Sequence, residues 1–389
     1  MKTNLITVAQ MLPDLHSGGV ERGTLELGDY LVRQGHRSIV ISEGGPMAAA
    51  LEKQGSRHIR LPVGGKNPIT LTAVLPLRRL LLREKVDILH LRSRVPAWVG
   101  YLAFKSLSPS LRPRLVTTFH GFYSINAYSA IMTRGEKIIA VSNTVATHIK
   151  TCYGIPDDRI HIIHRGFDEQ LFTPGKVDTA RINALKDRWS LTGSASPLIM
   201  LPGRITQWKG HDIFIRSLAA IKNLPWTAVC VGSFEGKQAL MRELTLLIRS
   251  CGLEGRIRFV GHCTDMPAAY LLSDIVVSAS STEPEAFGRV AIEAQAMGKP
   301  VVATAHGGSM ETVLDGKTGW LVAPGDVKRM ASALTDAVGK PDLRNHYGKA
   351  AMAWTRHQFT VEKMCKETLT LYESLLQRSD LNKKGIING

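Results

Sequence analysis

Two carboxylates eight residues apart occupy the stretch 280–303, with Glu285 in a predicted loop and Glu293 in the helix predicted to follow it. Gly288 lies between the loop and the helix, and Gly298 suits the left-handed conformation that commonly ends a helix. A carboxylate is a poor partner for a phosphate but accepts hydrogen bonds from vicinal hydroxyls. We therefore expect Glu293 to bind a ribose and Glu285 to bind sugar hydroxyls.

Backbone amides between these carboxylates could donate hydrogen bonds to the same ligand. They belong to Phe287, Gly288 and Arg289, at the predicted helix start, where amides lack intrahelical acceptors. The alternative is a structural helix whose N-terminal acids favour its dipole. The carboxylate spacing, the glycine turn and the apolar strand Val301–Ala303 occur together, and this combination favours a sugar-nucleotide site.

A cationic pair follows the first predicted strand in the second half of the chain. Arg204 and Lys209 lie between Gly203 and Gly210, directly after the apolar run 198–201. Doubly wound α/β sheets bind ligands at the carboxyl ends of their strands. An Arg fork and a Lys point charge suit a diphosphate, and a solvated surface pair is the alternative.

The first half carries a glycine turn, Gly18-Gly19 after Ser17, between an apolar run and a helical pattern. Such glycines let backbone N–H groups approach a phosphate at a helix N-terminus, although a structural turn is equally compatible with them. The turn lacks the G-x-G start of the dinucleotide fingerprint. His120 follows the predicted strand 115–119, where it could donate to a substrate oxygen or cap the strand.

Polar residues around the end of the predicted strand 88–91 form a candidate acceptor side, with structural roles as the alternative. They are His90, Arg92, Ser93 and Arg94. The chain contains no Asp-x-Asp, and the two cations could do the work of a divalent ion. We therefore expect no metal and no cofactor.

Alternating strand-like and helix-like segments must position these groups. The alternation runs through both halves, which predicts parallel sheets covered by helices on both faces. At 389 residues the chain exceeds the size of a single core. We expect an α/β fold of two Rossmann-like domains whose parallel sheets face each other across a cleft.

Domain boundaries follow from the looser pattern between Glu169 and Pro197. The predicted order is an N-terminal acceptor-binding domain at 1–172, a linker at 173–197, a C-terminal nucleotide-sugar-binding domain at 198–355, a helix at 356–378 packing back on the N-terminal domain, and a tail at 379–389.

Composition bounds the class of protein. Five scattered cysteines without a C-x-x-C pair argue for reduced thiols in a cytoplasm rather than a disulfide framework or a zinc site. The N-terminus lacks a signal-peptide core, and no window approaches the roughly 18–20 apolar residues of a membrane span. We expect a cytoplasmic protein, with peripheral association at the inner face of the cytoplasmic membrane as an open alternative.

The net charge of +16 is spread over the chain, with +9 in residues 1–175 and +7 in residues 176–389. A diffusely basic surface favours polyanions, and a solvated surface without a partner is the alternative. The basic amphipathic run Leu71–Lys85 could dock on an acidic membrane, although Pro76 interrupts it and its leucines could equally be core.

Taken together, these motifs resemble the retaining glycosyltransferases of family four, often called the group 1 family, which have the GT-B fold. The resemblance covers nearly the whole chain, and the softer likeness within the family is to cell-envelope and lipopolysaccharide-type transferases. The matching segments are Gly18-Gly19, the boundary Arg165–Pro174, Gly203–Gly210, Glu285–Ala294 and Gly307–Val322. The E-x7-E motif beside the R…K pair is specific, whereas the glycine loop is not.

The resemblance implies roles for the matching positions. Glu293 would bind the donor ribose, and Glu285 the hydroxyls of the transferred sugar. Arg204 and Lys209 would neutralise the diphosphate leaving group, helped by the Gly19 amide. The base pocket would include residues 259–263, among them Gly261 and His262, and His120 would lie beside the anomeric centre.

Two positions depart from the family pattern. Ala286 stands where the family usually has Gly, which narrows the space beside the donor sugar and leaves its identity open. Arg165 stands where the family usually has Asn, at the domain boundary.

The activity implied is transfer of a hexose from a nucleotide-diphosphate sugar, UDP- rather than GDP-linked, to a hydroxyl of a glycolipid or cell-envelope polysaccharide precursor. The rivals are weaker. A sugar-nucleotide epimerase of the same fold class needs an acid–base set that the sequence does not supply, and a nicotinamide oxidoreductase needs the missing glycine fingerprint. A nucleic-acid-binding protein would explain the charge, but only 6% of residues are aromatic, so few stacking platforms exist.

Overall fold

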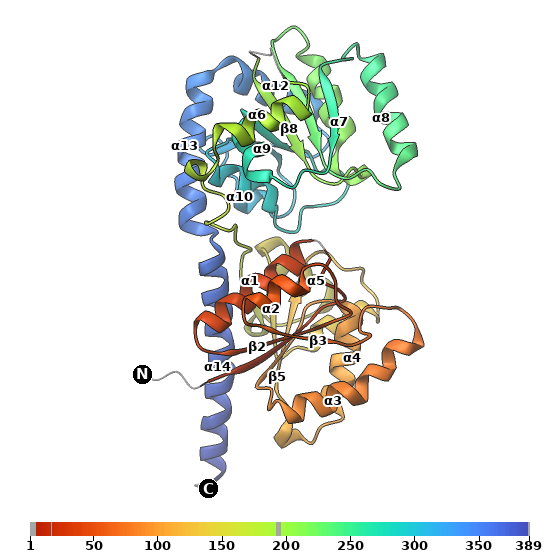
Figure 1. Ribbon diagram of the computed structural model, residues 1–389, viewed down its shortest axis with the longest axis vertical. Helices are drawn as coiled ribbons and strands as arrows, with labels where there is room; N and C mark the ends of the chain where they lie inside the picture. Colours follow the sequence, from red (N-terminus) through yellow and green to blue (C-terminus); the bar gives the residue numbers. More distant parts are fainter. Residues whose placement is uncertain (1–4, 17, 192–195, 388–389) are drawn as a thin grey trace. The chain divides into compact units, whose positions relative to one another are not determined.

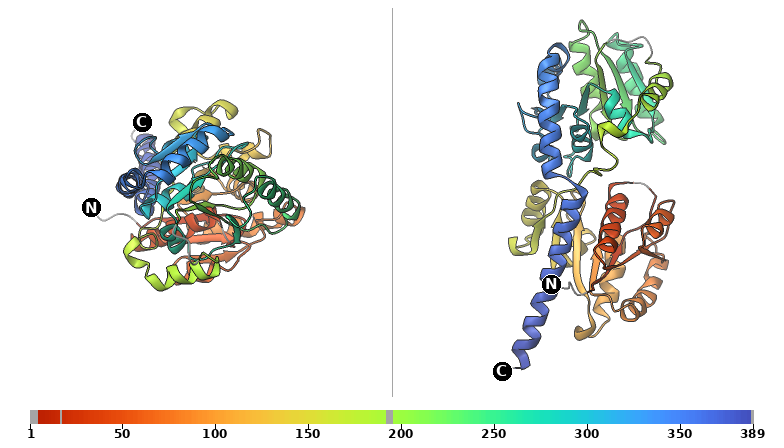
Figure 2. Two further views of the ribbon diagram at one scale, coloured as in Figure 1. Left: turned by 90° about the horizontal axis from the view of Figure 1, so that it is seen from above. Right: turned by 60° about the vertical axis from the view of Figure 1, so that its left-hand side comes forward.

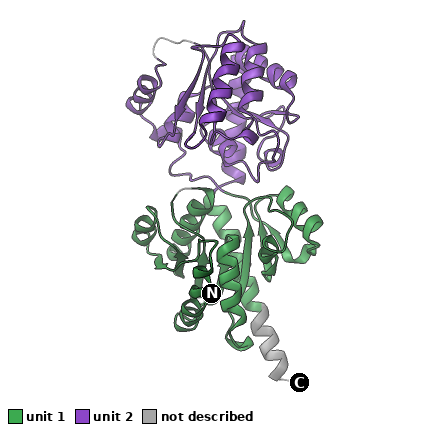
Figure 3. Cartoon of the chain, turned by 90° about the vertical axis from the view of Figure 1, so that its right-hand side faces the viewer, with its two compact units in different colours: residues 1–165, 361–389 green, residues 166–360 purple. Residues whose placement is uncertain are grey.

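The computed structural model describes residues 5–16, 18–191 and 196–387, with side chains described up to residue 377. The chain divides into two compact units: unit 1 comprises residues 1–165 and 361–389, and unit 2 comprises residues 166–360 (Figure 3). Each unit is a parallel β-sheet with helices on both faces (Figure 1). The predicted α/β class with two Rossmann-like domains is therefore confirmed.

Unit 1 contains a seven-stranded sheet in the order β3-β2-β1-β4-β5-β6-β7, with every neighbouring pair parallel. The strands are β1 (Thr7–Met11), β2 (Arg37–Ser42), β3 (Arg57–Arg60), β4 (Ile88–Leu91), β5 (Arg114–Phe119), β6 (Lys137–Ala140) and β7 (Ile160–Ile162). The helices are α1 (Gly19–Arg33), α2 (Ala48–Lys53), α3 (Val74–Arg83), α4 (Arg94–Lys105), α5 (Asn143–Tyr153) and α14 (Val361–Ile387), with the 3-10 turns η1 (Pro68–Ala73), η2 (Pro109–Leu111), η3 (Ser129–Arg134) and η4 (Asp157–Arg159).

Unit 2 contains a six-stranded parallel sheet in the order β10-β9-β8-β11-β12-β13. Its strands are β8 (Leu198–Pro202), β9 (Thr227–Val231), β10 (Ile257–Gly261), β11 (Ile275–Ser278), β12 (Val301–Thr304) and β13 (Gly319–Val322). Its helices are α6 (Thr179–Arg188), α7 (His211–Ala220), α8 (Gln238–Ser250), α9 (Met266–Leu272), α10 (Arg289–Ala296), α11 (Ser309–Thr312), α12 (Val327–Gly339) and α13 (Pro341–Gln358), with η5 (Pro174–Lys176) and η6 (Gln207–Lys209).

Strand composition explains the layering. The central strands β1, β4, β8, β11 and β12 are buried along their whole length, as expected for strands covered on both faces. Both sheets reverse their strand order once, between β1 and β4 in unit 1 and between β8 and β11 in unit 2. Ligands of doubly wound folds bind at such switch points.

The last helix belongs to unit 1. In Figure 1 and in the right-hand view of Figure 2, α14 runs alongside the sheet of unit 1. Its Met364, Cys365 and Tyr372 are buried in one core cluster with Ile6 of the first segment and Tyr30 of α1. The first and last parts of the chain therefore share a core.

Three boundaries differ from the predicted ones. Unit 1 gives way to unit 2 at 165/166 rather than after 172, because the amide of Phe167 donates to the carbonyl of Phe359 (2.9 Å) inside unit 2. The predicted linker 173–197 contains η5 and α6, and Arg181 of α6 forms an ion pair with Asp265 (2.6 Å).

The predicted helix 356–378 is instead the end of α13 followed by α14, which continues through most of the predicted tail to Ile387. The two helices separate at Phe359, whose backbone leaves the helical region (ψ 48°) and whose ring packs on Phe287. Among the described helices, none combines the length and the apolar character that crossing a bilayer requires.

Candidate active site

The two loops at the switch point of unit 2 meet at the carboxyl edge of its sheet. One loop follows β8 and leads through η6 into α7, and the other joins β11 to α10. The amide of Ser281 donates to the carbonyl of Trp208 (2.8 Å). A Cβ on Gly210 would lie 1.9 Å from the carbonyl oxygen of Ala279, so glycine is required for this close approach.

This contact brings two predicted site residues together. The ammonium group of Lys209 forms a hydrogen-bonded ion pair with Glu285, and both side chains are mostly buried, with 16% and 12% exposed. Ser280 Oγ also donates to Glu285 Oε1 (2.9 Å). The Lys209 ammonium lies 4.2 Å from the Trp208 ring centroid, a cation–π distance. The lysine is thus held by two partners at the edge of the sheet.

Two glycines after β12 hold the backbone of Glu285. The Gly308 amide donates to the Glu285 carbonyl (2.8 Å), and Gly307 forms an isolated parallel bridge with the same residue. Gly307 has a φ of +70°, and a Cβ there would lie 2.1 Å from the Glu285 carbonyl oxygen. The Gly-Gly pair of the sequence motif is therefore a backbone support for the carboxylate loop.

Arg204, the other predicted phosphate cation, is exposed, and it forms no ion pair with any residue of the described chain. The next residue, Ile205, is 1% exposed and anchors the loop in the core of unit 2. The guanidinium is therefore available to a ligand, whereas the Lys209 ammonium must exchange a protein partner for one.

Three glycines line the ends of neighbouring strands β8, β9 and β10. The Gly203 amide donates to the carbonyl of Val231, and the Gly232 amide donates to that of Gly261, both at 2.8 Å. A Cβ on Gly232 would lie 1.9 Å from the Gly203 carbonyl oxygen. Beside this row of backbone, His262 is exposed. The predicted base-pocket residues thus continue the same sheet edge.

Glu293 lies in α10, 8% exposed, and its two oxygens have different neighbours. Tyr270 donates its hydroxyl hydrogen to Oε2 (3.2 Å), and the Arg289 Nε lies 3.5 Å from Oε1. Gly288 caps the helix in the left-handed conformation (φ +91°). Phe287 is 3% exposed and packs its ring inward, so only its backbone can face a ligand.

In unit 1, α1 begins directly at Gly19, so its first amides have no intrahelical acceptor. Gly18 and Gly19 are both exposed, and the preceding Ser17 lies outside the described residues. The carbonyl of Gly19 accepts a hydrogen bond from Arg165 Nη2. A Cβ on Gly23, one turn along α1, would lie 2.3 Å from that nitrogen. Arg165 thus holds the start of α1.

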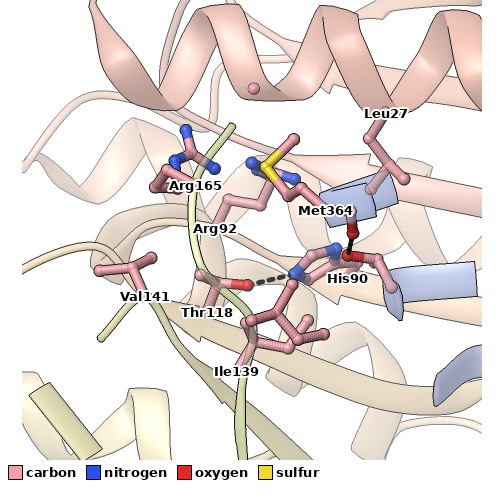
Figure 4. A pocket seen from close by; sticks show the side chains of 11 residues that line it. Leu27, His90, Arg92, Thr118, Ile139, Val141, Arg165 and Met364 are labelled. Atoms are coloured by element: carbon pink, nitrogen blue, oxygen red, sulfur yellow. Dashed lines mark hydrogen bonds between the residues drawn. The ribbon is translucent and has the colours of Figure 1, made fainter. Parts of the chain in front are cut away.

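Two of the predicted acceptor-side residues are buried beneath that helix start. His90 is 1% exposed and lies between the Thr118 hydroxyl and the Tyr372 hydroxyl, both at 2.6 Å. Arg92 is 3% exposed and donates to Gln10 Oε1 (2.8 Å). Both side chains line a cavity of about 20 Å³, shown in Figure 4. The expectation that they contact an acceptor is therefore corrected, because they hold β4 to its neighbours and to α14.

The other two acceptor-side residues start α4. Ser93 is its N-cap residue, without a side-chain capping hydrogen bond. The Arg94 guanidinium lies 4.9 Å and 5.3 Å from the ring centroids of Tyr123 and Tyr128, and it donates to Ser129 Oγ (3.2 Å). Arg94 is thus a half-buried, fixed cation at the carboxyl edge of the sheet.

His120 follows β5 at this edge. Burial lowers its pKa well below the usual value, and the nearby cations Arg165 and Arg92 add to that effect. Its Nε2 is buried and has no hydrogen-bond partner among the described residues. A neutral imidazole with an unsatisfied nitrogen can accept or donate a hydrogen bond according to its tautomer, which fits a residue that orients a substrate oxygen.

The sequence alone did not predict several residues that contact the candidate site. Tyr270 reaches Glu293 from α9, and Ser280 reaches Glu285 from the end of β11. Of these, only Gly232 could have been predicted from the sequence. It directly follows β9, and a glycine at the end of an apolar run indicates a close backbone approach. No local pattern marks Tyr270.

Comparisons with known proteins find related glycosyltransferases. A family model described as Glycosyltransferase Family 4 matches residues 17–171, and one described as Glycosyl transferases group 1 matches residues 186–354. The lipopolysaccharide core biosynthesis mannosyltransferase LpsB of Rhizobium meliloti is 31% identical over 257 residues, which cover 64% of this chain and 68% of that protein.

A D-inositol 3-phosphate glycosyltransferase of Xylanimonas cellulosilytica is also 31% identical, over 64% of this chain and 59% of that relative. Across this and three further relatives of the same name, the chain spans only 51–60% of their length. A crystal structure of a glycosyltransferase from Rickettsia africae superposes with a TM-score of 0.88 at 34% identity, covering 96% of this chain and 99% of the other.

Proposed function

Because the chain belongs to the family 4 and group 1 glycosyltransferases of GT-B fold, we propose that it transfers a hexose from a nucleotide-diphosphate sugar to a hydroxyl acceptor. The observation that carries the proposal is the Lys209–Glu285 ion pair at the switch point of unit 2. The pair supports the proposal because a lysine cation suits a diphosphate and a carboxylate accepts hydrogen bonds from sugar hydroxyls.

Arg204 and Lys209 are proposed to stabilise the charge that develops on the departing diphosphate, in place of a divalent ion. Donors fixed in advance at the position of developing charge are commonly the largest catalytic contribution. Glu285 and the Trp208 ring hold the Lys209 ammonium at the edge of the sheet, and a bound diphosphate would share this cation with Glu285. The exposed Arg204 would complete the clamp when the donor binds.

Glu293 is proposed to bind the donor ribose. A carboxylate accepts hydrogen bonds from vicinal hydroxyls, and Tyr270 and Arg289 hold the Glu293 carboxylate in place. The base would lie along residues 259–263, beside Gly261 and the exposed His262. We propose uridine rather than guanosine as the base.

The transfer is proposed to proceed with retention at the anomeric carbon, with a leaving-phosphate oxygen taking the proton of the acceptor hydroxyl as the new bond forms. His120 would orient an oxygen near the anomeric centre as a neutral imidazole. The relative LpsB is named as a lipopolysaccharide core mannosyltransferase. That name supports a hexose donor and a glycolipid or cell-envelope precursor as acceptor.

Binding and hydrolysis of donors test the proposal. Titration calorimetry with UDP, GDP and NAD should show binding of a nucleoside diphosphate, with UDP the tightest. Hydrolysis across UDP- and GDP-hexoses then identifies the sugar, and the anomeric configuration of the released sugar, followed by NMR at early times, reports retention. Binding of NAD alone, or no binding of either diphosphate, contradicts the proposal.

A further inference from the structure

Exposed apolar side chains gather on one part of unit 1. Ile69 and Leu71 of η1 are 64% and 54% exposed, and Leu75 in the first turn of α3 is 61% exposed. Trp98 and Leu102, one turn apart on α4, are 36% and 40% exposed. A set of this size goes beyond the scattered single apolar residues that protein surfaces normally carry.

The elements that carry these residues lie together in unit 1. The elements η1, α3 and α4 pack against one another, and Figure 1 shows α3 and α4 side by side. Trp98 Nε1 donates to the Tyr128 carbonyl (3.1 Å), and the Lys66 ammonium lies 5.8 Å from the Tyr128 ring centroid. We call the five apolar residues together with the exposed cations Lys66, Arg79 and Lys105 the η1–α4 surface.

The segment that carries this surface is strongly basic. Residues 66–135 contain eleven Lys and Arg but only two Asp and Glu. Both acids are engaged internally: Glu84 is 8% exposed and pairs with Arg37 and Arg57, and Asp87 accepts a hydrogen bond from the Thr7 amide. The outward charge of this region is therefore positive.

Exposed cations border the apolar residues. Lys66, Arg79 and Lys105 are exposed, and they extend from the loop before η1, from α3 and from the end of α4. Long basic side chains of this kind can hold their charge at a polar boundary while their aliphatic stems lie on apolar surface. Apolar side chains flanked by Lys and Arg are the composition of an interfacial membrane contact.

We propose that the η1–α4 surface docks the protein on a bilayer rich in anionic lipid. The apolar side chains would enter the boundary between head groups and acyl chains, and the cations would bind lipid phosphates. The run Leu71–Lys85 contributes only its exposed residues to this surface, because Leu77, Leu80 and Leu81 are core residues, 0–5% exposed. Docking requires no nucleotide, so the docking proposal can be tested independently of the proposed reaction.

Vesicle sedimentation of the full chain tests this proposal. The protein should sediment with vesicles of 70% phosphatidylcholine and 30% phosphatidylglycerol at 50 mM NaCl, and it should be released at 500 mM NaCl. Each Lys or Arg near such a surface changes affinity by about fivefold, so Arg79→Ser with Lys105→Ser should weaken binding about 25-fold. Ile69→Ser with Leu71→Ser should weaken it at least tenfold, without loss of UDP binding.

Matched exposed residues of unit 2 serve as controls. Leu246 is 61% exposed on α8, and Arg242 on the same helix is exposed. Leu246→Ser and Arg242→Ser should leave sedimentation unchanged. The proposal is overturned if the wild type stays in the supernatant with anionic vesicles, if the η1–α4 variants sediment like the wild type, or if an oligonucleotide of equal charge concentration displaces the protein from the vesicles.

Discussion

Lys209 and Glu285, 76 positions apart in the chain, are ion-paired partners at the edge of the unit 2 sheet. A donor diphosphate that binds Lys209 must share this cation with Glu285 or draw it away. A mostly buried pair of this kind leaves an uncompensated charge when one member is removed. In the proposed reaction, this pair would link donor binding to the stability of the loop.

Lys209→Ala should reduce turnover about 10²–10³-fold, the loss expected for one donor to a developing oxyanion. It should also lower the free energy of unfolding, because Glu285 loses its cation. Arg204→Ala should reduce turnover comparably without that loss of stability, since Arg204 is exposed. Steady-state kinetics and urea unfolding measure both quantities, with exposed Lys237→Ala as the control. Wild-type turnover in the Lys209 and Arg204 variants would remove the diphosphate assignment.

Tyr270→Phe should weaken nucleotide binding several-fold, because its hydroxyl hydrogen bond to Glu293 contributes about 1 kcal/mol to holding the carboxylate. Glu293→Gln should weaken binding further, since it alters the acceptor itself. Calorimetry with UDP measures both effects, and KM should change more than kcat. Tyr347→Phe, a half-buried tyrosine on α13, is the matched control. Equal UDP affinity in Glu293→Gln and wild type would show that the ribose lies elsewhere.

Gly23→Ala should destabilise the protein by about 1–3 kcal/mol, the usual cost of overpacking. The new Cβ would lie 2.3 Å from Arg165 Nη2 and would push the guanidinium off the Gly19 carbonyl. In an Arg165→Asn background the same substitution should cost much less, and a double-mutant cycle in urea quantifies this coupling. Gly121→Ala, which meets no atom within 4 Å, is the control. Additive costs would refute the contact.

Acid should destabilise unit 2 through His211. Burial lowers the pKa of this histidine to about 4, and the nearby cation Lys209 adds to that effect. The unfolded chain binds the proton near pH 6.5 but the folded chain does so only near pH 4. Stability is therefore complete above pH 6.5 and declines as the pH falls toward 4, by up to about 3 kcal/mol.

Urea unfolding between pH 7.5 and 4.5 measures this decline, and His211→Leu should flatten it. His346→Gln on the exposed side of α13 should not. Identical pH profiles for His211→Leu and wild type would exclude His211 as the source.

The sequence was most informative where a loop follows a strand. Arg204, Lys209 and Glu285 could be located because strand ends at a switch point converge. No comparable rule predicts which side chains from distant elements contact each other. Nothing near His90 indicates that Tyr372, 282 positions later in the chain, forms a hydrogen bond with its ring nitrogen.

The run Leu71–Lys85 shows a related difficulty. Its hydrophobic pattern is compatible with a core face or a membrane face. In the structure, Leu77, Leu80 and Leu81 of α3 are buried in the core. The sequence gives no signal for the break at Phe359, because no proline or glycine lies at the end of α13.

Because α14 packs in unit 1, the core of unit 1 cannot be completed until the end of the chain has been synthesised. A ribosome adding about 5–20 residues per second needs roughly 10–40 s to make unit 2 after the last strand of unit 1 has emerged. During that interval Ile6 and Tyr30 lack their packing partner Cys365, and the His90 ring lacks its hydrogen-bond partner Tyr372. Unit 1 begins first in the chain, but its core is completed last. A nascent chain stalled within unit 2 should therefore bind chaperones that recognise exposed apolar surface.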